Sequence, residues 1–324
     1  MIRTFVVEND RLVCVEEADP RVGQAVWLDL LNPTKEEEHS VESRLGLLLP
    51  TREEMEEIEI SSRLYVEDGA YFMTATVPAF VEGKAPVIAP VTFVLAGGRL
   101  VTIRYHEPRA FKTFPQRAEK ASTGCSGGDT ILVTLLEAIV DRLADILERA
   151  SRDVEGISRD IFEARSKKAS SRNRDFQELL KAIGLKEDLT SNLRDSLLSL
   201  KRLAGFFAHA TTTIKTTKEV RARVKTLSRD IVSLADHTTF LSQKINFLLD
   251  ATLGMISIEQ NAIIKIFSVA AVVFLPPTLV ASIYGMNFQV MPELGWSFGY
   301  PMALGLMVLS AILPFVWFRS KGWL

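Results

Sequence analysis

A stripe of small and polar residues runs along the last part of one long predicted helix. In alternating steps of four and three residues from Asp250, it comprises Gly254, Ser257, Asn261, Ile264, Ser268, Ala271, Leu275, Thr278 and Ser282. Such steps keep residues on one face of a helix. The other faces carry Ile, Phe, Val and Leu. Because a face in contact with lipid does not favour Ser, Asn and Thr, we expect the stripe to face protein or water.

Two interpretations of this stripe stay open. One is close packing of helices through small residues, with side-chain hydrogen bonds across the contact. The other is a pore lined by the same face of several copies, which requires a closed homo-oligomer because one hairpin cannot enclose a pore. Asn261 and Thr278 are larger than packing needs, which favours the pore. Pro276-Pro277 also favours the pore. Proline has no N–H, so two backbone carbonyls one turn earlier lose their helical donors. At membrane depth such carbonyls need hydrogen bonds from neighbouring groups or from pore water.

The chain carries two segments that are long and apolar enough to cross a membrane. Residues 266–292 and 294–318 contain no Asp, Glu, Lys or Arg. A bilayer core of about 30 Å requires roughly 20 apolar residues in a helix. We therefore predict transmembrane helix 1 at 263–284, an outer loop at 285–299 and transmembrane helix 2 at 300–318. The alternative, a buried soluble hairpin, is disfavoured because two uncharged runs of this length rarely share a soluble core.

The charged residues beside these segments predict their orientation. Lys265 precedes the first segment, Arg319 and Lys321 follow the second, and the loop between them has no Lys or Arg. The positive-inside rule then places both termini and the basic tail 319–324 in the cytoplasm. The absence of a long apolar stretch near the start agrees with a cytoplasmic N-terminus. Aromatic residues flank both segments, as in interfacial belts: Trp296, Tyr300, Trp317 and Trp323.

The first part of the chain, residues 1–126, alternates strand and helix signals and predicts a compact α/β domain. Strands are expected on both sides of Asn9-Asp10 and at AVWLDLL, and a hairpin is expected to turn at Gly97-Gly98. Two short acidic helices are each expected to begin with a capping box. The pairs Thr34 with Glu37 and Thr51 with Glu54 have the residue types and the spacing of that motif.

Residues 127–262 predict a stalk of long helices. Apolar residues recur at helical spacing from residue 132 onward. The last helix begins after TTTIKTTKE and continues into the membrane, for roughly 65 residues or on the order of 100 Å. The predicted fold class is α+β: an N-terminal α/β cytoplasmic domain, a long helical stalk and two C-terminal transmembrane helices.

Several classes of function are disfavoured by composition. A net charge of −2 gives no reason to expect nucleic acid as a partner. Cys14 and Cys125 are far apart and have no metal-ligand spacing, and the four histidines are scattered. The chain has no GxxxxGK[ST], GxGxxG or HExxH motif. We therefore do not expect an enzyme.

The outer loop resembles the signature of the CorA family of magnesium transport proteins. It reads YGMNF from Tyr284 and then MPEL from Met291. The segments EQNAIIKIFSVAAVVFLPPTLVASIYGMNF and MPELGWSFGYP, and the ending KGWL, look very close to the bacterial type. The strong likeness covers about residues 245–324, and upstream it is one of architecture. GMN alone is a weak motif, but GMN between a proline-containing segment and MPEL is a strong one.

The resemblance implies a homopentamer in the inner membrane, with the first transmembrane helix lining the pore and the second packed outside it. Gly285, Met286 and Asn287 match the selectivity filter, where Asn287 supplies a side-chain carbonyl and Gly285 a backbone carbonyl to a hydrated ion. The matching pore-lining positions are Asn261, Ile264, Phe267, Ser268, Ala271, Leu275, Thr278 and Ser282. Ile264, Phe267 and Leu275 match a hydrophobic constriction, where some family members have methionine instead.

Two acidic residues complete the predicted sites. Asp250 lies where some family members place a cytoplasmic acid that binds regulatory Mg²⁺, and the alternative is an ordinary helix-surface charge. Its acidic partner on a neighbouring subunit is not defined by the sequence. Glu293 is the only charged residue of the outer loop. Repeated around an oligomer it would raise the local cation concentration, and the alternative is a solvated loop charge.

The resemblance thus implies a channel for Mg²⁺ influx down the membrane potential, with Mg²⁺ both transported and regulatory. Mg²⁺ holds its waters tightly, so neutral oxygens that accept hydrogen bonds from those waters suit it better than carboxylates, which would release it slowly. Co²⁺ and Ni²⁺ stay open as further permeant ions. The rival hypotheses are a transporter of Zn²⁺ or another transition metal from the same superfamily, disfavoured by MPEL, and a membrane-anchored scaffold that conducts nothing.

Overall fold

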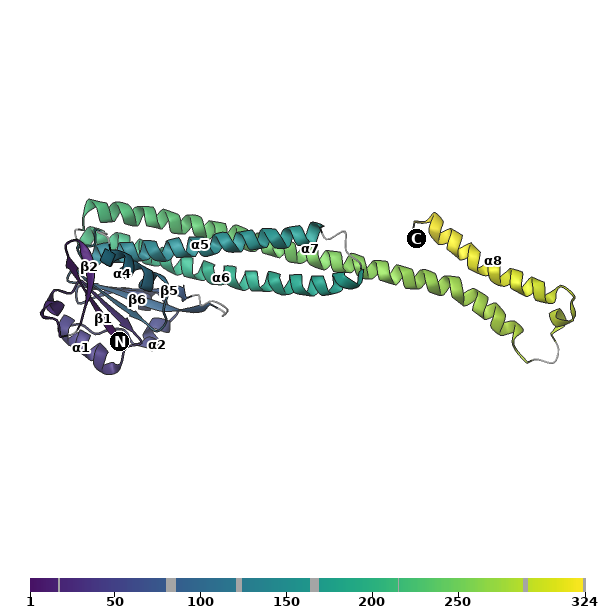
Figure 1. Ribbon diagram of the computed structural model, residues 1–324, viewed down its shortest axis with the longest axis horizontal. Coiled ribbons are helices and arrows are strands. Elements are labelled where there is room, and N and C mark those ends of the chain that lie inside the picture. Colours follow the sequence, from purple (N-terminus) through teal and green to yellow (C-terminus); the bar gives the residue numbers. More distant parts are fainter. Residues whose placement is uncertain are drawn as a thin grey trace. The chain divides into compact units, whose positions relative to one another are not determined.

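The computed structural model describes residues 1–16, 18–79, 86–120, 124–163, 169–214, 216–287 and 291–322. Contacts divide the chain into two units. The first comprises residues 1–167 with 178–248, and the second comprises 168–177 with 249–324. The predicted fold class is confirmed, because the elements are a mixed sheet, long helices and two apolar C-terminal helices (Figure 1).

A seven-stranded sheet forms most of the N-terminal region, in the order β2-β1-β3-β7-β6-β5-β4. The strands are β1 (Ile2–Glu8), β2 (Arg11–Val15), β3 (Trp27–Leu31), β4 (Leu64–Glu67), β5 (Ala70–Ala79), β6 (Val87–Ala96) and β7 (Arg99–Arg104). Among the described strands, only β3 and β7 pair in parallel. The turns predicted at Asn9-Asp10 and Gly97-Gly98 are confirmed, and all four residues have positive φ. Glycine adopts such φ values without strain, as at Gly97 and Gly98.

Helices cover the sheet and continue beyond it. Within the described residues they are η1 (Pro20–Gln24), α1 (Lys35–Leu45), α2 (Arg52–Glu56), α3 (Ile60–Arg63), α4 (Ala110–Lys120), α5 (Gly128–Glu163), α6 (Ala169–Thr213), α7 (Lys218–Tyr284), η3 (Pro292–Gly295) and α8 (Gly299–Ser320). Both predicted capping boxes are present, at Thr34 and Thr51. The predicted long helix is confirmed as α7, which has 67 residues.

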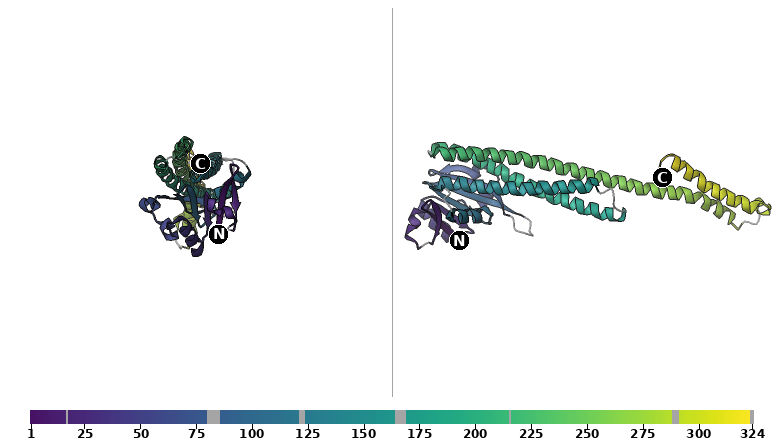
Figure 2. Two further views of the ribbon diagram at one scale, coloured as in Figure 1. Left: turned by 90° about the vertical axis from the view of Figure 1, so that its left-hand side faces the viewer. Right: turned by 45° about the horizontal axis from the view of Figure 1, so that its top comes forward.

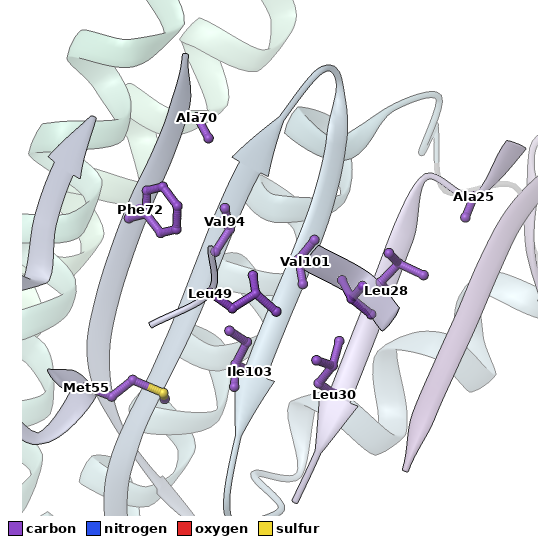
Figure 3. Packing of buried hydrophobic residues seen from close by; sticks show 11 residues of the cluster. Ala25, Leu28, Leu30, Leu49, Met55, Ala70, Phe72, Val94, Val101 and Ile103 are labelled. Carbon is purple, nitrogen blue, oxygen red and sulfur yellow. The ribbon is translucent and has the colours of Figure 1, made fainter. Parts of the chain in front are cut away.

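The two faces of the sheet pack against different helices. On one face, Leu28, Leu30 and Ile103 join Val41 of α1 and Met55 of α2 in an apolar cluster, most of which Figure 3 shows. On the other face, the Trp27 ring stacks on Phe5 with centroids 4.5 Å apart and lies beside Phe111 and Phe114 of α4. Successive residues of β3 therefore serve opposite cores, as the two-residue period of a strand requires.

A buried ion pair joins the parallel strands at the centre of this sheet. Arg104 donates from Nε and Nη2 to the two carboxylate oxygens of Asp29, each at 2.9 Å, and both side chains are wholly buried. Arg3 and Thr102 donate to the same carboxylate. A buried carboxylate is tolerated only when it is paired and hydrogen-bonded in this way. The network was not among the sequence predictions.

Three long helices extend from the sheet, and polar contacts fix them to each other. α5, α6 and the first part of α7 run side by side in both figures (Figure 1, Figure 2). Arg223 of α7 bonds to the Glu137 carboxylate of α5, with the nearer nitrogen–oxygen distance 2.5 Å. Ser199 of α6 accepts a hydrogen bond from the Thr76 N–H of β5 at 2.9 Å. The first contact ties α7 to α5, and the second ties α6 to the sheet.

Candidate ion-conduction site

The second unit consists mainly of two apolar helices, the last part of α7 and α8. Their most apolar 18-residue windows have mean hydropathy of 2.2 and 2.0, and only 6% and 11% of these windows are buried. Core helices of soluble proteins are mostly buried, whereas these expose Leu275, Leu309 and Leu313 by 58% or more. Nearly all of their surface is therefore available to lipid or to other copies of the chain.

The predicted pore residues all lie on α7, and all are exposed: Asn261, Ile264, Phe267, Ser268, Ala271, Leu275, Thr278 and Ser282. At 1.5 Å per residue, the distance from Asn261 to Ser282 is roughly 32 Å. That length is close to the bilayer core of about 30 Å. Phe267 lies one position away from the regular series, beside Ser268. The stripe is thus continuous over a length that matches a membrane.

Thr278 presents hydrogen-bond acceptors only. Its hydroxyl donates to the Phe274 carbonyl at 2.7 Å, so its proton is already engaged and its lone pairs remain. One turn earlier, the carbonyls of Val272 and Val273 have no helical N–H partner, because Pro276 and Pro277 occupy the positions that would donate. Several oxygens at this level can therefore accept hydrogen bonds from water, as the waters around a cation require.

The three predicted filter residues lie together where α7 ends. The Gly285 N–H donates to the Ala281 carbonyl at 2.9 Å, and the Met286 N–H donates to the Ile283 carbonyl at 3.2 Å. Asn287 follows outside the helix and is exposed. Its side chain has no hydrogen bond to another described residue. Phe288, which belongs to the quoted signature, lies outside the described residues.

The two predicted acidic residues occupy different places. Glu293 lies in η3 and is half-buried beside a cavity that Gly285 also lines. Asp250 is exposed on α7, and at 1.5 Å per residue it lies roughly 16 Å before Asn261. The structure therefore brings Glu293 close to the filter residues and does not bring Asp250 there. In the part of the chain that the structure describes, no group of three His, Cys, Asp or Glu residues is placed to hold a metal ion.

Sequence reasoning missed one feature of this unit, the cavity of about 380 Å³ beside Glu293. It is formed by the end of α7, η3 and the first turns of α8. Tyr284, Trp296 and Tyr300 contribute to its lining. The sequence offered only a weak signal for it, the aromatic residues that flank the two apolar segments.

Fold and site together define an integral membrane protein with two C-terminal spans and a large soluble sheet-and-helix domain. Comparisons with known proteins agree. A family model described as CorA-like Mg²⁺ transporter protein matches residues 22–320. The chain is 39% identical to the magnesium transport protein CorA of Pasteurella multocida (strain Pm70) and 40% identical to that of Escherichia coli (strain K12), with both chains covered completely in each case.

Solved structures support the same fold. The complete structure of the CorA magnesium transporter from Methanocaldococcus jannaschii matches with a TM-score of 0.72 at 19% identity, covering 100% of this chain and 99% of that one. The full-length CmaX protein matches with a TM-score of 0.67 at 14% identity, covering 99% and 97%. The chain belongs to the CorA-like Mg²⁺ transporter family, and the family predicted from its outer loop is confirmed.

Proposed function

We propose that this chain forms a homopentameric channel that admits Mg²⁺ through the inner membrane. The observation that carries the proposal is the exposed stripe of mainly small and neutral polar residues on the last part of α7, whose other faces there are apolar and mostly exposed. Its length matches the membrane core. The relatives with 39% and 40% identity are named magnesium transport proteins, which supports Mg²⁺ as the ion.

Assembly follows from the position of the stripe. Copies of α7 surround the pore with the stripe inward, and α8 packs outside them towards lipid. Each copy presents the same two surfaces to its neighbours, and in this proposal the rotation between neighbours closes a ring of five. The loop 285–299 lacks Lys and Arg, whereas Lys265, Arg319 and Lys321 flank the helices. Both termini therefore lie in the cytoplasm.

Selection acts on the hydrated ion. Mg²⁺ loses its waters reluctantly, and those waters donate hydrogen bonds outward. The backbone carbonyl of Gly285 and the side-chain carbonyl of Asn287 accept them at the outer mouth, with Met286 completing the ring. Thr278 and Asn261 repeat the interaction further in, followed by Ser268 and Ser282 along the same face.

The membrane potential drives entry, and a hydrophobic constriction controls it. Each elementary charge that crosses 100 mV gains about 2.3 kcal/mol, so a divalent cation gains about twice that. Ile264, Phe267 and Leu275 are exposed apolar side chains on α7. Brought together around the axis, they would exclude water in the closed state. The small side chain of Ala271 lies between them and leaves room for the helices to shift.

Cytoplasmic Mg²⁺ acts as the regulatory ion. In this proposal it bridges Asp250 to an acidic group of a neighbouring subunit and stabilises the closed arrangement. When Mg²⁺ falls, the acidic groups repel and the open arrangement is favoured, which is a population shift by a ligand that prefers one state. Glu293 raises the cation concentration at the outer mouth.

The test is ion influx into proteoliposomes that contain the full-length protein and a Mg²⁺-sensitive dye. We expect Mg²⁺ influx under an inside-negative potential, a much slower influx at zero potential, and competition by Co²⁺ and Ni²⁺. Empty liposomes at the same potential are the control. Influx of Zn²⁺ but not Mg²⁺ would favour the transition-metal transporter. Absence of all influx from folded, correctly inserted protein would favour the scaffold.

A further inference from the structure

A cavity of about 380 Å³ lies between the end of α7, η3 and the first turns of α8. Tyr284, Glu293, Trp296, Tyr300 and Ala303 line it, and Gly285 of the filter contributes to the same wall. Its size falls in the range of small-molecule sites, which begins at about 300 Å³. It lies at the end of both apolar helices, where a bilayer places its headgroups.

Glu293, which lines this cavity, has no cation beside its carboxylate in the part of the chain that the structure describes. Glu293 is half-buried, and residues 266–318 contain no Lys, Arg or His. Among the described residues, its side chain makes no ion pair or hydrogen bond. A partly desolvated carboxylate is stabilised by a cation held close to it. That cation has to come from outside this part of the chain.

The start of α8 lines the same cavity and carries a partial positive charge, opposite in sign to the Glu293 carboxylate. Phe298 occupies its N-cap position and provides no side-chain hydrogen bond to the first turn. Gly299 and Tyr300, the first two residues of the helix, line the cavity. The N-terminus of this 22-residue helix carries a partial positive charge, which favours an anionic oxygen. Because the Gly299 N–H bonds to Trp296 and Pro301 has no N–H, the Tyr300 N–H is the donor that the first turn offers.

Aromatic residues line the same cavity as these two polar groups. Tyr284, Trp296 and Tyr300 contribute to the lining, and Trp296 and Tyr300 are 59% and 77% exposed. Such rings settle at the membrane interface. Their faces also attract ammonium groups, more strongly where water is excluded. The cavity therefore suits a ligand with an ammonium group, a nearby anion and an apolar remainder.

Gly299 fixes the distance between the two polar groups. A Cβ atom on this residue would lie 2.3 Å from the Glu293 carbonyl oxygen, so only glycine lets η3 close this tightly on the start of α8. The Gly299 N–H also donates to the Trp296 carbonyl at 3.0 Å. The carboxylate-bearing turn and the uncapped helix start are thus held together by backbone geometry.

We propose that this cavity binds the headgroup of phosphatidylethanolamine. Its ammonium group lies against Glu293 and the aromatic rings, its phosphate lies at the N-terminus of α8, and its acyl chains follow the exposed faces of α7 and α8. The proposal rests on the membrane placement used in the proposed function. Because Gly285 lines the same cavity, a bound headgroup stabilises the end of α7 beside the filter. Glu293 attracts cations to the outer mouth, as proposed above, only in subunits whose cavity holds no headgroup.

The experiment measures lipid retention by the purified, delipidated full-length oligomer in native mass spectrometry. Phosphatidylethanolamine and phosphatidylglycerol with identical acyl chains are added in equal amounts. We expect wild type to retain the ethanolamine lipid in preference to the glycerol lipid. Glu293→Gln, which keeps the side-chain shape, should lower that preference about tenfold, in line with loss of one charge-assisted hydrogen bond. Trp296→Leu should lower it by a smaller factor.

Trp317→Leu, at the opposite end of α8, is the matched control and should retain the wild-type preference. Circular dichroism and oligomer size confirm that each variant is folded. Equal retention of the two lipids by wild type, or an unchanged preference in Glu293→Gln, would overturn the site. Mg²⁺ influx is measured separately on the same proteins. Loss of influx with an intact lipid preference would count against the channel and not against the lipid site.

Discussion

The sheet domain and the membrane unit treat their polar groups in opposite ways. In the sheet, Asp29 and Arg104 are wholly buried and each is paired with the other. In the membrane unit, Asn261 on α7 and Asn287 just after this helix are exposed, and the Thr278 hydroxyl bonds only to its own helix. The sheet domain therefore pairs its buried polar side chains with each other, whereas the membrane unit leaves these polar side chains exposed. We conclude that stabilising side-chain contacts are concentrated in the first region, and that the second leaves its polar groups available to the partners proposed above.

The largest effect on stability is expected from Asp29→Ala. It leaves the Arg104 guanidinium buried without its counter-ion, and breaking a buried pair from one side costs about 3–5 kcal/mol. Thermal unfolding of the full-length protein, followed by circular dichroism, should show a large fall in midpoint. Asp19→Ala is the matched control, because Asp19 also pairs with an arginine, Arg21, but at the surface. Equal falls of the unfolding midpoint in both variants would contradict a special contribution of the buried Asp29–Arg104 pair to the stability of the sheet domain.

Asp250→Lys should alter regulation and leave folding intact. The exposed carboxylate would no longer bind cytoplasmic Mg²⁺, so the Mg²⁺ concentration that halves influx should rise about tenfold or more, the effect of one lost charge-assisted contact. Asp236→Lys is the matched control, since Asp236 is exposed on α7 two heptads before Asp250 and therefore lies on the same face of the helix. Inhibition that stays unchanged in Asp250→Lys would show that Asp250 is an ordinary surface charge.

Thr278→Val should reduce Mg²⁺ influx several-fold. Valine keeps the side-chain shape and removes an acceptor oxygen, and a hydrogen bond of this kind contributes about 1 kcal/mol. Thr278→Ser should retain influx. Thr239→Val is the control, because the Thr239 hydroxyl makes the same type of bond to the carbonyl four residues earlier, in the stalk part of α7. If both valine variants conduct like wild type, Thr278 does not contact the ion's waters.

The smallest effect concerns pH and His106 in the sheet domain. Its Nε2 lies 2.6 Å from the Val77 carbonyl oxygen, and burial lowers the pKa of the ring, with the Arg104 guanidinium adding to the effect. In the unfolded chain a histidine has a pKa near 6.5. Neutral His106 therefore adds stability above that pH, and this contribution is lost as the pH falls towards the lowered folded pKa.

His106→Gln should make the unfolding midpoint less dependent on pH between neutrality and mild acid. His39→Gln is the control, because the His39 side chain is 82% exposed and its loss should leave the dependence unchanged. A wild-type midpoint that rises on acidification would contradict this assignment.

Local rules made much of the sheet domain predictable. Thr34 and Thr51 carry complete capping boxes in their own sequence, and Gly97-Gly98 specifies its hairpin turn. The long α7 followed from unbroken helical spacing. The pairing of Asp29 with Arg104 could not be predicted in this way, because it depends on β3 lying beside β7, some seventy residues further along the chain.

The candidate site was predictable only in part, for a related reason. The stripe on α7 follows from spacing within one helix, so its exposed residues could be named in advance. The cavity at Glu293 depends on how η3 folds back onto α8, and that depends on the close contact at Gly299. The proposed packing of other copies around the stripe depends on contacts between chains, which the sequence of one chain indicates only through resemblance.

The central claim is that Asn287, which follows the end of α7, selects hydrated Mg²⁺. The most direct measurement is Mg²⁺ influx into proteoliposomes under an inside-negative potential, for wild type, Asn287→Ala and Ser320→Ala, a control at the opposite end of α8. We predict influx in wild type and in the control, and a loss of about tenfold or more in Asn287→Ala, because each subunit loses a hydrogen bond to the ion's waters. Equal influx in all three proteins would contradict the claim.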